Sequence, residues 1–171
     1  MKKFFRMVCV LALAICPLVG CFNDANGNNS CSNDYFSGGT GDEYVDLGLP
    51  SGTLWKNKNE AGGFYTYKQA VNDFGSSLPT KEQWEELQKL CIWTWKENGY
   101  MVIGRNGNTI FLPAYGFINC DGNVFSVGSF GYYWSSTPSD SGYAWGLLFY
   151  EAGLGIGRHQ RCWRLSVRLV H

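Results

Sequence analysis

The spacing of hydrophobic residues changes its period close to residue 91. Between Tyr67 and Phe74, and again between Thr80 and Cys91, apolar residues recur every three or four positions, which predicts two helices. Beyond Cys91 apolar and polar residues alternate, which predicts strands over 92–96, 100–103, 109–112, 123–127, 145–150 and 163–169. A further short strand is expected over 44–50. This order predicts an α+β fold in which two N-terminal helices precede a twisted, mainly antiparallel sheet with long loops.

Local signals support these elements. Thr80 can cap the second helix, and Gln83 three positions later completes a capping box. Trp84 and Leu87 then lie on one apolar face of that helix. Tight turns need positive φ angles that Gly and Asn adopt easily, so hairpin turns are predicted at Asn98-Gly99, Asn106-Gly107 and Asp121-Gly122.

The C-terminal third contains two alternating segments separated by a glycine-rich stretch, 153–157, which is expected to form a loop. In the first segment Trp145, Leu147 and Phe149 share one face, so the residues between them are predicted to point outward. In the second segment the apolar residues are expected to face the core, and the arginines between them to form one polar face. These apolar residues are Trp163, Leu165, Val167 and Leu169.

The N-terminus has the features of an export signal. Residues 1–20 contain a basic start followed by an apolar stretch too short to span a bilayer. The sequence Leu-Val-Gly-Cys that ends at Cys21 resembles a bacterial lipobox, which predicts a lipidated Cys21 and removal of the leader. Residues 21–42 are rich in Asn, Ser and Gly and are expected to be a flexible tether, and 43–171 to be the globular domain. Phe22 after the cysteine favours sorting to the outer membrane, so a lipid-anchored protein at the cell surface is expected. A soluble secreted protein is the alternative.

Composition narrows the classes of function. The 171 residues are 45% hydrophobic and 16% charged, which excludes wholesale disorder. The formal net charge is zero for the whole chain, and it is −3 for residues 21–171, where 11 basic residues stand against 14 acidic ones. Neither net charge indicates the basic surface that nucleic-acid binding requires, so no nucleic-acid partner is predicted.

Four cysteines remain after the leader and the lipidated residue are set aside: Cys31, Cys91, Cys120 and Cys162. An exported protein favours disulfides, and four cysteines allow three pairings. The preferred bridge is Cys120–Cys162, while Cys91 at the end of a helix is a candidate for simple burial. None of the four has CxxC spacing, so no metal site is predicted.

Longer motifs agree in order with one known family. They are VDLGLPSGTLW from Val45, LPTKEQWEEL from Leu78, CIWTW from Cys91, GNTIFLPA from Gly107, YYWSSTP from Tyr132 and LSVR from Leu165. Through these motifs the chain resembles the Fibrobacter succinogenes major paralogous domain over about Glu43 to Val170. The resemblance implies a lipoprotein with a C-type-lectin-like fold, related to the formylglycine-generating enzymes.

Three activities of that wider fold group can be compared with the sequence. The Glu-Pro-Asn, Gln-Pro-Asp and Trp-Asn-Asp signatures of calcium-dependent sugar binding do not occur, so no metal or cofactor is expected. Formylglycine-generating enzymes use two cysteines near the C-terminus, where this chain has only Cys162. The third activity is display of a ligand-binding surface, which in some lipoproteins is varied by a diversity-generating retroelement.

The sequence therefore predicts a non-catalytic surface lipoprotein that binds an unknown protein or glycan. Tyr, Trp and Arg dominate binding hot spots, and the predicted binding residues are Gly146, Leu148, Tyr150, Glu151, Gly155, Gly157, Arg158, His159, Gln160, Trp163 and Arg164. Ordinary sheet packing is the alternative for each of them. A structural or adhesin-tip component of a surface assembly is the alternative function. An enzyme using His159 with Glu151 or with Cys162 is less favoured, since nothing in the sequence orients the base.

Overall fold

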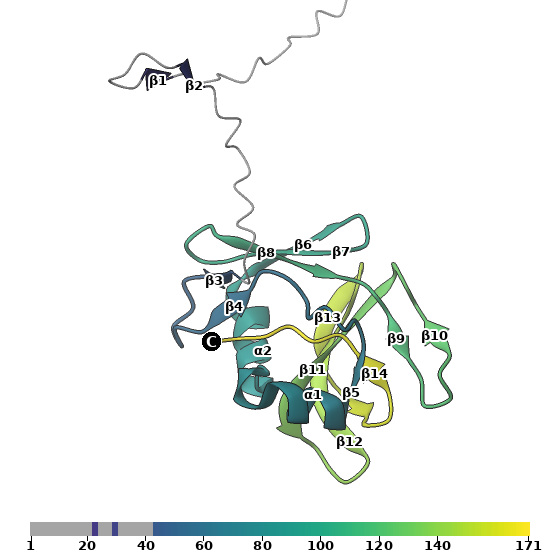
Figure 1. Cartoon of the computed structure of the whole chain (residues 1–171). Helices are drawn as coiled ribbons and strands as arrows, with labels where there is room; N and C mark the ends of the chain where they lie inside the picture. The colour runs from purple at the N-terminus through teal and green to yellow at the C-terminus, as the bar shows by residue number, and fades with distance from the viewer. Residues whose placement is uncertain (1–21, 24–28, 31–42) are drawn as a thin grey trace, which may run out of the picture. The chain divides into compact units, whose positions relative to one another are not determined.

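The structure is a computed structural model that describes residues 22–23, 29–30 and 43–171 (Figure 1). The chain divides into two compact units, residues 1–39 and 40–171. In the first unit β1 (Phe22–Asn23) pairs antiparallel with β2 (Asn29–Ser30). The predicted leader, Cys21 and Cys31 lie outside the described residues. Within the described part of the chain, no helix has the length and apolar character needed to cross a membrane.

The second unit combines two α-helices with several small antiparallel sheets, which confirms the predicted α+β class. The elements are β3 (Tyr44–Asp46), β4 (Leu54–Lys56), β5 (Tyr65–Thr66), α1 (Tyr67–Phe74), the 3-10 helix η1 (Gly75–Ser77), α2 (Lys81–Leu90), β6 (Ile92–Lys96), β7 (Gly99–Ile103), β8 (Thr109–Pro113), β9 (Phe117–Ile118), β10 (Val124–Phe125), β11 (Phe130–Pro138), β12 (Tyr143–Tyr150), β13 (Gly153–Gln160) and β14 (Arg164–Leu165). The sheets have the strand orders β3-β4, β6-β7-β8, β11-β12-β13 and β10-β9-β14-β5.

Both predicted helices are present, and their starts follow from local chemistry. The capping box of α2 is confirmed: the Thr80 hydroxyl accepts from the Gln83 N–H, and the Gln83 side chain accepts from the Thr80 N–H. Trp84 and Leu87 of α2 are completely buried, as their spacing predicted. The helix ends at Leu90, and its C-cap residue, Cys91, is half-buried.

The first hairpin turn lies one residue earlier than predicted. Glu97 and Asn98 form the turn between β6 and β7, whereas Gly99 is the first residue of β7. A Cβ at Gly99 would meet the backbone of β8, so this glycine is required by strand packing rather than by the turn. The turns at Asn106-Gly107 and Asp121-Gly122 are present, but the strand predicted over 123–127 contains only Val124 and Phe125.

Two predictions for the C-terminal third are wrong. The expected loop 153–157 belongs to β13, because each residue from Gly153 to Gln160 is paired with β12 and the chain turns at Glu151 and Ala152. The expected strand 163–169 contains only β14, and no polar face alternates there, since Ser166 and Arg168 are as buried as their apolar neighbours. The nine-residue strand β11 is not among the predicted strands; the sequence marks part of it only through the YYWSSTP motif.

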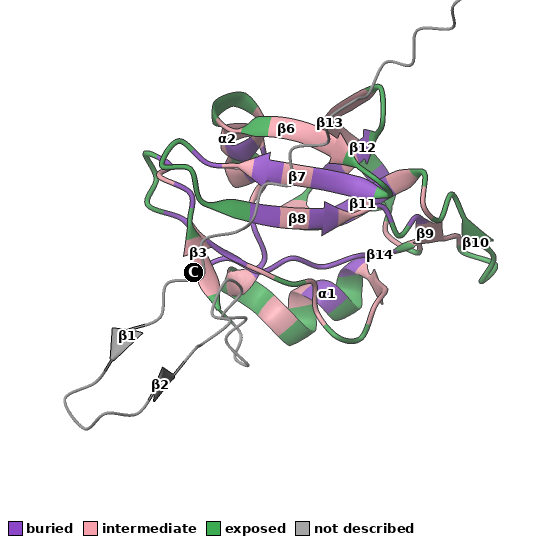
Figure 2. Ribbon diagram, turned by 90° about the horizontal axis from the view of Figure 1, so that it is seen from above, coloured by how far each residue is buried: buried purple, intermediate pink, exposed green. Residues whose placement is uncertain are grey.

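The hydrophobic core consists of two clusters within residues 44–170 (Figure 2). Helix α2 packs against one face of the β11-β12-β13 sheet and buries Trp84 beside Tyr133. The second cluster joins α1, Trp134 and the C-terminal segment. Both clusters are formed by residues between Tyr44 and Val170, and a segment of this length can fold around a hydrophobic core of its own.

Candidate functional site

The β11-β12-β13 sheet has two different faces. Leu147 and Phe149 of β12, with Leu154 and Ile156 of β13, point toward α2 and belong to the core. The opposite side, here named the glycine face, contains the residues that alternate with them. These are Phe130, Tyr132 and Trp134 of β11, Ala144, Gly146, Leu148 and Tyr150 of β12, and Gly153, Gly155, Gly157 and His159 of β13.

Half of the glycine face is covered and half is open. Trp134, Ala144, Gly146 and His159 are buried, because the segment with α1, β14 and Trp163 packs over them. At the other half Tyr150 is 42% exposed. Apart from the two residues next to Gly155 in the chain, no residue has an atom within 4 Å of the place where a Cβ of Gly155 would stand, so the sheet surface is bare there.

An unbroken series of aromatic rings, here named the aromatic row, borders the open half. Its ring centroids are separated by 5.4 Å from Phe125 to Phe117, 4.8 Å from Phe117 to Tyr132, 6.2 Å from Tyr132 to Phe130 and 5.1 Å from Phe130 to Tyr150. Phe125 and Tyr150, its two ends, are both exposed. The row thus runs from the β9–β10 hairpin to the end of β12.

A cleft of about 300 Å³, here named the acidic cleft, lies at the Tyr150 end of the row. Its lining comes from three turns and their strands: Trp95, Glu97, Gly128, Ser129, Phe130, Tyr150 and Glu151. The Tyr100 hydroxyl fixes one wall, since its oxygen lies 3.2 Å from the carbonyl oxygens of both Tyr150 and Glu151. The cleft and the aromatic row therefore form one continuous surface of rings and carboxylates.

A family model described as a domain of unknown function, DUF8237, matches residues 79–170, more than half of the chain. The chain belongs to the DUF8237 family. No curated protein and no solved structure matches it. The matched segment runs from the start of α2 to the C-terminal segment, so the DUF8237 region includes the glycine face, the aromatic row and the acidic cleft.

The DUF8237 domain brings together only some of the residues predicted for a binding site. Leu148, Tyr150, Gly155 and Gly157 share the glycine face, and Glu151 lies in the adjoining turn. Arg158 points to the other side of β13, where its Nη1 lies 3.3 Å from Asp140 Oδ2. Exposed Gln160 contacts the disulfide, Arg164 is exposed on β14, and half-buried Trp163 stacks on Phe117 with ring centroids 4.3 Å apart.

Two of the predicted residues are buried rather than outward-facing. A Cβ at Gly146 would collide with the backbone carbonyl of Tyr133, so this glycine serves close packing of β11 on β12. His159 is only 4% exposed and is surrounded by Tyr132, Trp134 and Trp163. Both lie on the predicted face, but residues distant in the sequence cover that part of it.

Sequence reasoning missed most of the aromatic row and of the acidic cleft. Phe130 and Tyr132 are two positions apart in the sequence. Because side chains two positions apart in a strand point to the same face, this spacing was the signal that could have identified them. Phe117, Phe125, Trp95 and Glu97 come from hairpins whose position beside the sheet no local pattern indicates.

The environment of His159 makes its protonation unfavourable. Burial lowers the pKa of His159 from its ordinary 6.5 to about 4, and a hydrogen bond with the Gly146 backbone offsets only part of this effect. Its Nε2 has no hydrogen-bond partner among the described residues. At neutral pH the imidazole is therefore uncharged and enclosed by rings.

This burial predicts a loss of stability in acid. The unfolded chain takes up a proton on His159 below about pH 6.5, whereas the folded domain does so only near pH 4. The domain is therefore most stable above about pH 6.5. Its free energy of unfolding falls by about 3 kcal/mol as the pH drops through the range from 6.5 to 4. Urea denaturation at several pH values should show a shallower acid decline in His159→Phe than in the wild type. His171→Gln, at an exposed histidine, should keep the wild-type decline; a wild-type decline in His159→Phe would contradict the argument.

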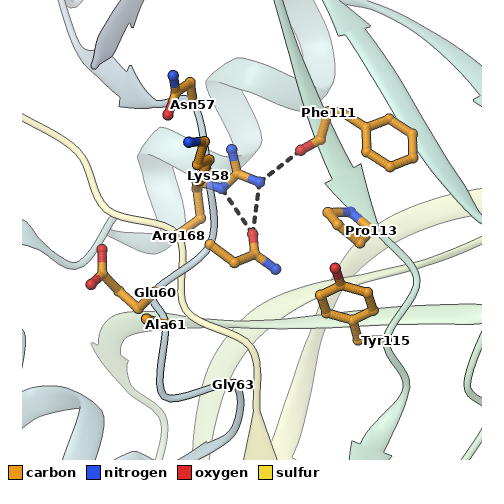
Figure 3. A pocket seen from close by; sticks show the side chains of 10 residues that line it. Asn57, Lys58, Glu60, Ala61, Gly63, Phe111, Pro113, Tyr115 and Arg168 are labelled. Carbon is orange, nitrogen blue, oxygen red and sulfur yellow. Dashed lines mark hydrogen bonds between the residues drawn. The ribbon is translucent and has the colours of Figure 1, made fainter. Parts of the chain in front are cut away.

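A second cavity, of about 440 Å³, lies beside Arg168, Asn59 and Tyr115 (Figure 3). The guanidinium of Arg168 donates to Asn59 Oδ1 and to the carbonyl oxygens of Lys56 and Phe111, at 2.7–2.9 Å. These bonds join the C-terminal segment to the loop after β4 and to β8. Arg168 therefore borders this cavity, and the hydrogen bonds of its guanidinium join parts of the fold to one another.

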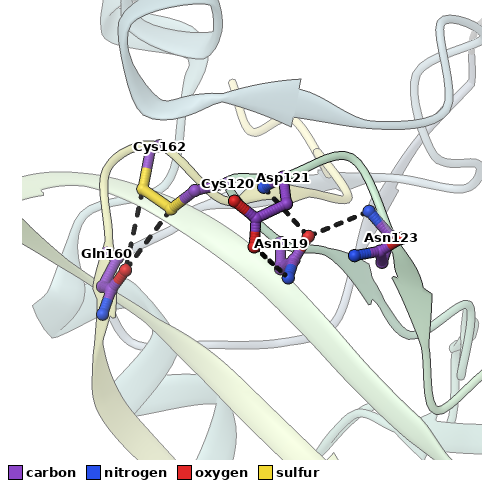
Figure 4. Close-up of a disulfide and its surroundings, with 6 residues drawn as sticks. All are labelled: Asn119, Cys120, Asp121, Asn123, Gln160 and Cys162. Atoms are coloured by element: carbon purple, nitrogen blue, oxygen red, sulfur yellow. Dashed lines mark hydrogen bonds between the residues drawn. A yellow bond between two sulfur atoms is a disulfide. The ribbon is translucent and has the colours of Figure 1, made fainter.

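The sulfur chemistry of the domain is largely structural. The predicted bridge Cys120–Cys162 is present, linking the β9–β10 turn to the turn after β13 (Figure 4). Cys162 therefore has no free thiol to act with His159. Burial raises the pKa of the Cys91 thiol to about 11, so it stays protonated at neutral pH.

Among the described residues no group of three His, Cys, Asp or Glu side chains is placed to hold a metal ion.

Proposed function

We propose that this DUF8237 protein is a non-catalytic binding module and that the aromatic row with the open half of the glycine face is its binding surface. The observation that carries the proposal is the row of rings, exposed at its two ends and half-buried between them, beside a strand surface left bare at Gly155. Contiguous apolar patches on the surface of a folded domain mark interaction sites when they are large. Val124 and Val127, both more than half exposed beside Phe125, extend the apolar surface at one end of the row.

The chemistry of this surface suits recognition. Aromatic side chains contribute large contact areas and lose little conformational entropy on binding, since each has only two rotatable bonds. Phe130 and Phe117 are already held by ring contacts on both sides, so their orientation is set before a ligand arrives. The glycines of β13 let a flat ligand approach the sheet backbone closely.

The remaining parts of the proposal concern fold relationship and location. Two helices packed with small antiparallel sheets are compatible with a C-type-lectin-like arrangement, and the motif resemblance to the Fibrobacter succinogenes major paralogous domain supports the same assignment. The lipobox-like sequence ending at Cys21 supports a lipid anchor that displays the domain at the outer membrane. The ligand we propose is a protein or a glycan, and binding of residues 43–171 to protein and glycan arrays tests this.

A valine at Gly155 is expected to block binding without harming the fold. The added side chain occupies open space on a β-strand, so the free energy of unfolding should change by less than about 1 kcal/mol. The same side chain would fill the bare surface and should weaken an array ligand by about tenfold or more. Binding is measured by titration calorimetry and stability by urea denaturation.

The matched control is Gly142→Val in the β11–β12 turn, where the nearest neighbouring atom would be 3.7 Å from the new Cβ. This variant should bind normally. Tyr150→Ala, which removes the exposed end of the row, should weaken binding by about 1–4 kcal/mol. Unchanged affinity in both Gly155→Val and Tyr150→Ala would place the binding surface elsewhere.

A further inference from the structure

We infer that the acidic cleft binds an alkylammonium group of the ligand. This inference rests on the proposed function and deepens it, because it names the chemistry recognised at one end of the same surface. It depends on three properties of the cleft: its aromatic walls, its two carboxylates and its size.

The walls present three aromatic rings from different elements. Phe130 of β11 and Tyr150 of β12 stack with an interplanar angle of 25°, and Trp95 of β6 also lines the cleft. Trp95 is held in turn by Tyr100, whose ring meets it edge-on at 5.1 Å. Aromatic rings attract cations through their negative π faces, and quaternary ammonium groups are recognised in this way.

The charge of the cleft is negative and is not balanced from within. Glu97 and Glu151 line it, and no lysine, arginine or histidine does. Across residues 43–171, neither glutamate forms an ion pair; the described ion pairs use Glu60, Glu85 and Asp140 instead. Two free carboxylates beside aromatic faces attract a cation and repel an anion.

Both carboxylates are placed by turns that are tied together. Glu97 begins the β6–β7 turn and Glu151 begins the β12–β13 turn. The Tyr100 hydroxyl, from the strand after Glu97, contacts the carbonyl oxygen of Glu151. The two acidic turns therefore keep a fixed relation to each other, which a site for a single positive group requires.

The dimensions fit a small head group. A cleft of about 300 Å³ is at the lower end of the range for small-molecule sites. A tri-alkylated or primary ammonium on a short chain has this size. It could belong to a free small molecule or to a lysine side chain of a protein ligand, and both present the same charge to the cleft.

The test uses choline and its uncharged isostere 3,3-dimethylbutan-1-ol, which has the same shape without the positive charge. Each is titrated into residues 43–171 at constant low ionic strength and followed by NMR chemical-shift changes. We expect choline to shift the Trp95 indole signal and to bind about tenfold tighter than the isostere. Nα-acetyl-lysine amide, titrated in parallel, distinguishes a polypeptide source from a free quaternary ammonium.

Charge-neutral variants locate the binding. Glu97→Gln and Glu151→Gln should each weaken choline binding by about fivefold. Glu43→Gln, which removes an exposed carboxylate at the start of the domain, should leave it unchanged. Raising the salt concentration should weaken binding to the wild type, since exposed charges are screened.

Equal binding of choline and its isostere would overturn the inference. Equal losses of choline affinity in Glu43→Gln and in the two cleft variants would also overturn it, because the loss would then reflect the net charge of the domain and not the cleft. If choline does not bind while array ligands still bind and are blocked by Gly155→Val, the inference fails and the proposed function stands. If neither choline nor any array ligand binds, both fail.

Discussion

Replacing Arg168 by methionine is expected to lower the free energy of unfolding by about 3–5 kcal/mol. Arg168 is 1% exposed, and its guanidinium donates to Asn59 Oδ1 and to two backbone carbonyl oxygens, of Lys56 and Phe111. Methionine fills similar space but leaves these acceptors buried without donors. Exchanging both partners of a buried polar pair for apolar groups can be neutral, but backbone carbonyls cannot be exchanged.

The loss should spread beyond Arg168 itself. Asn59, which accepts two bonds from Arg168, also donates to the Tyr133 hydroxyl, and Tyr133 donates to the Pro113 carbonyl. Tyr133 lies fully inside the first core cluster. Removing the guanidinium therefore frees Asn59 from the position that satisfies a buried tyrosine.

Urea denaturation of residues 43–171 measures the effect. Arg168→Lys should also be destabilised, because one ammonium cannot reach three acceptors that a planar guanidinium meets together. Arg105→Met, at an exposed arginine in the β7–β8 turn, should remain within about 0.5 kcal/mol of the wild type. A loss below about 1 kcal/mol for Arg168→Met would show that water or rearrangement satisfies the carbonyls.

The burial of Arg168 also explains why one strand prediction failed. Alternation between 163 and 169 predicts a strand with an outward polar face, yet this segment is held by hydrogen bonds to several different elements. The rule that arginine points to water fails where the fold supplies acceptors from loops far away in the sequence. In contrast, the helices were predictable because Thr80 and Gln83 act within one turn of α2.

The glycine face shows the same contrast between local and distant interactions. The strand period correctly placed Gly146, Leu148 and Tyr150 on one side of β12. It could not indicate that Trp163 and α1 would cover one half of that side and bury His159. The same limit hid the aromatic row, since Phe117 reaches Tyr132 only through folding of the β9–β10 hairpin.

Removing the disulfide with Cys120→Ser and Cys162→Ser together is expected to cost about 4 kcal/mol of stability. The two cysteines are 42 positions apart, and a bridge that closes a loop of this length restricts the unfolded chain strongly. Their Cα atoms are 5.1 Å apart, a separation that a bridge spans without movement of the backbone. Treating the wild type with a reductant should lower its unfolding midpoint to that of the double variant.

The control for altered sulfur chemistry is Cys91→Ala, since Cys91 is the free cysteine of the described residues. It is half-buried at the end of α2 and should lose less than about 2 kcal/mol. Reductant should still destabilise this variant by the full amount. If the double serine variant and the wild type unfold at the same urea concentration, the bridge does not constrain the domain.

Loss of the bridge should also weaken ligand binding in the molecules that remain folded. The β9–β10 hairpin is a short ladder whose turn is anchored by Cys120, and it carries Phe117 and Phe125 of the aromatic row. Without the anchor the hairpin gains freedom that a ligand must remove on binding, so affinity should fall although no ring has been replaced. Calorimetry at a temperature where the double variant is fully folded should therefore show weaker binding with a less favourable entropy. Unchanged affinity would mean that the other contacts of the hairpin, among them the pairing of β9 with β14 and the packing of Phe117 on Tyr132, hold it in place without the bridge.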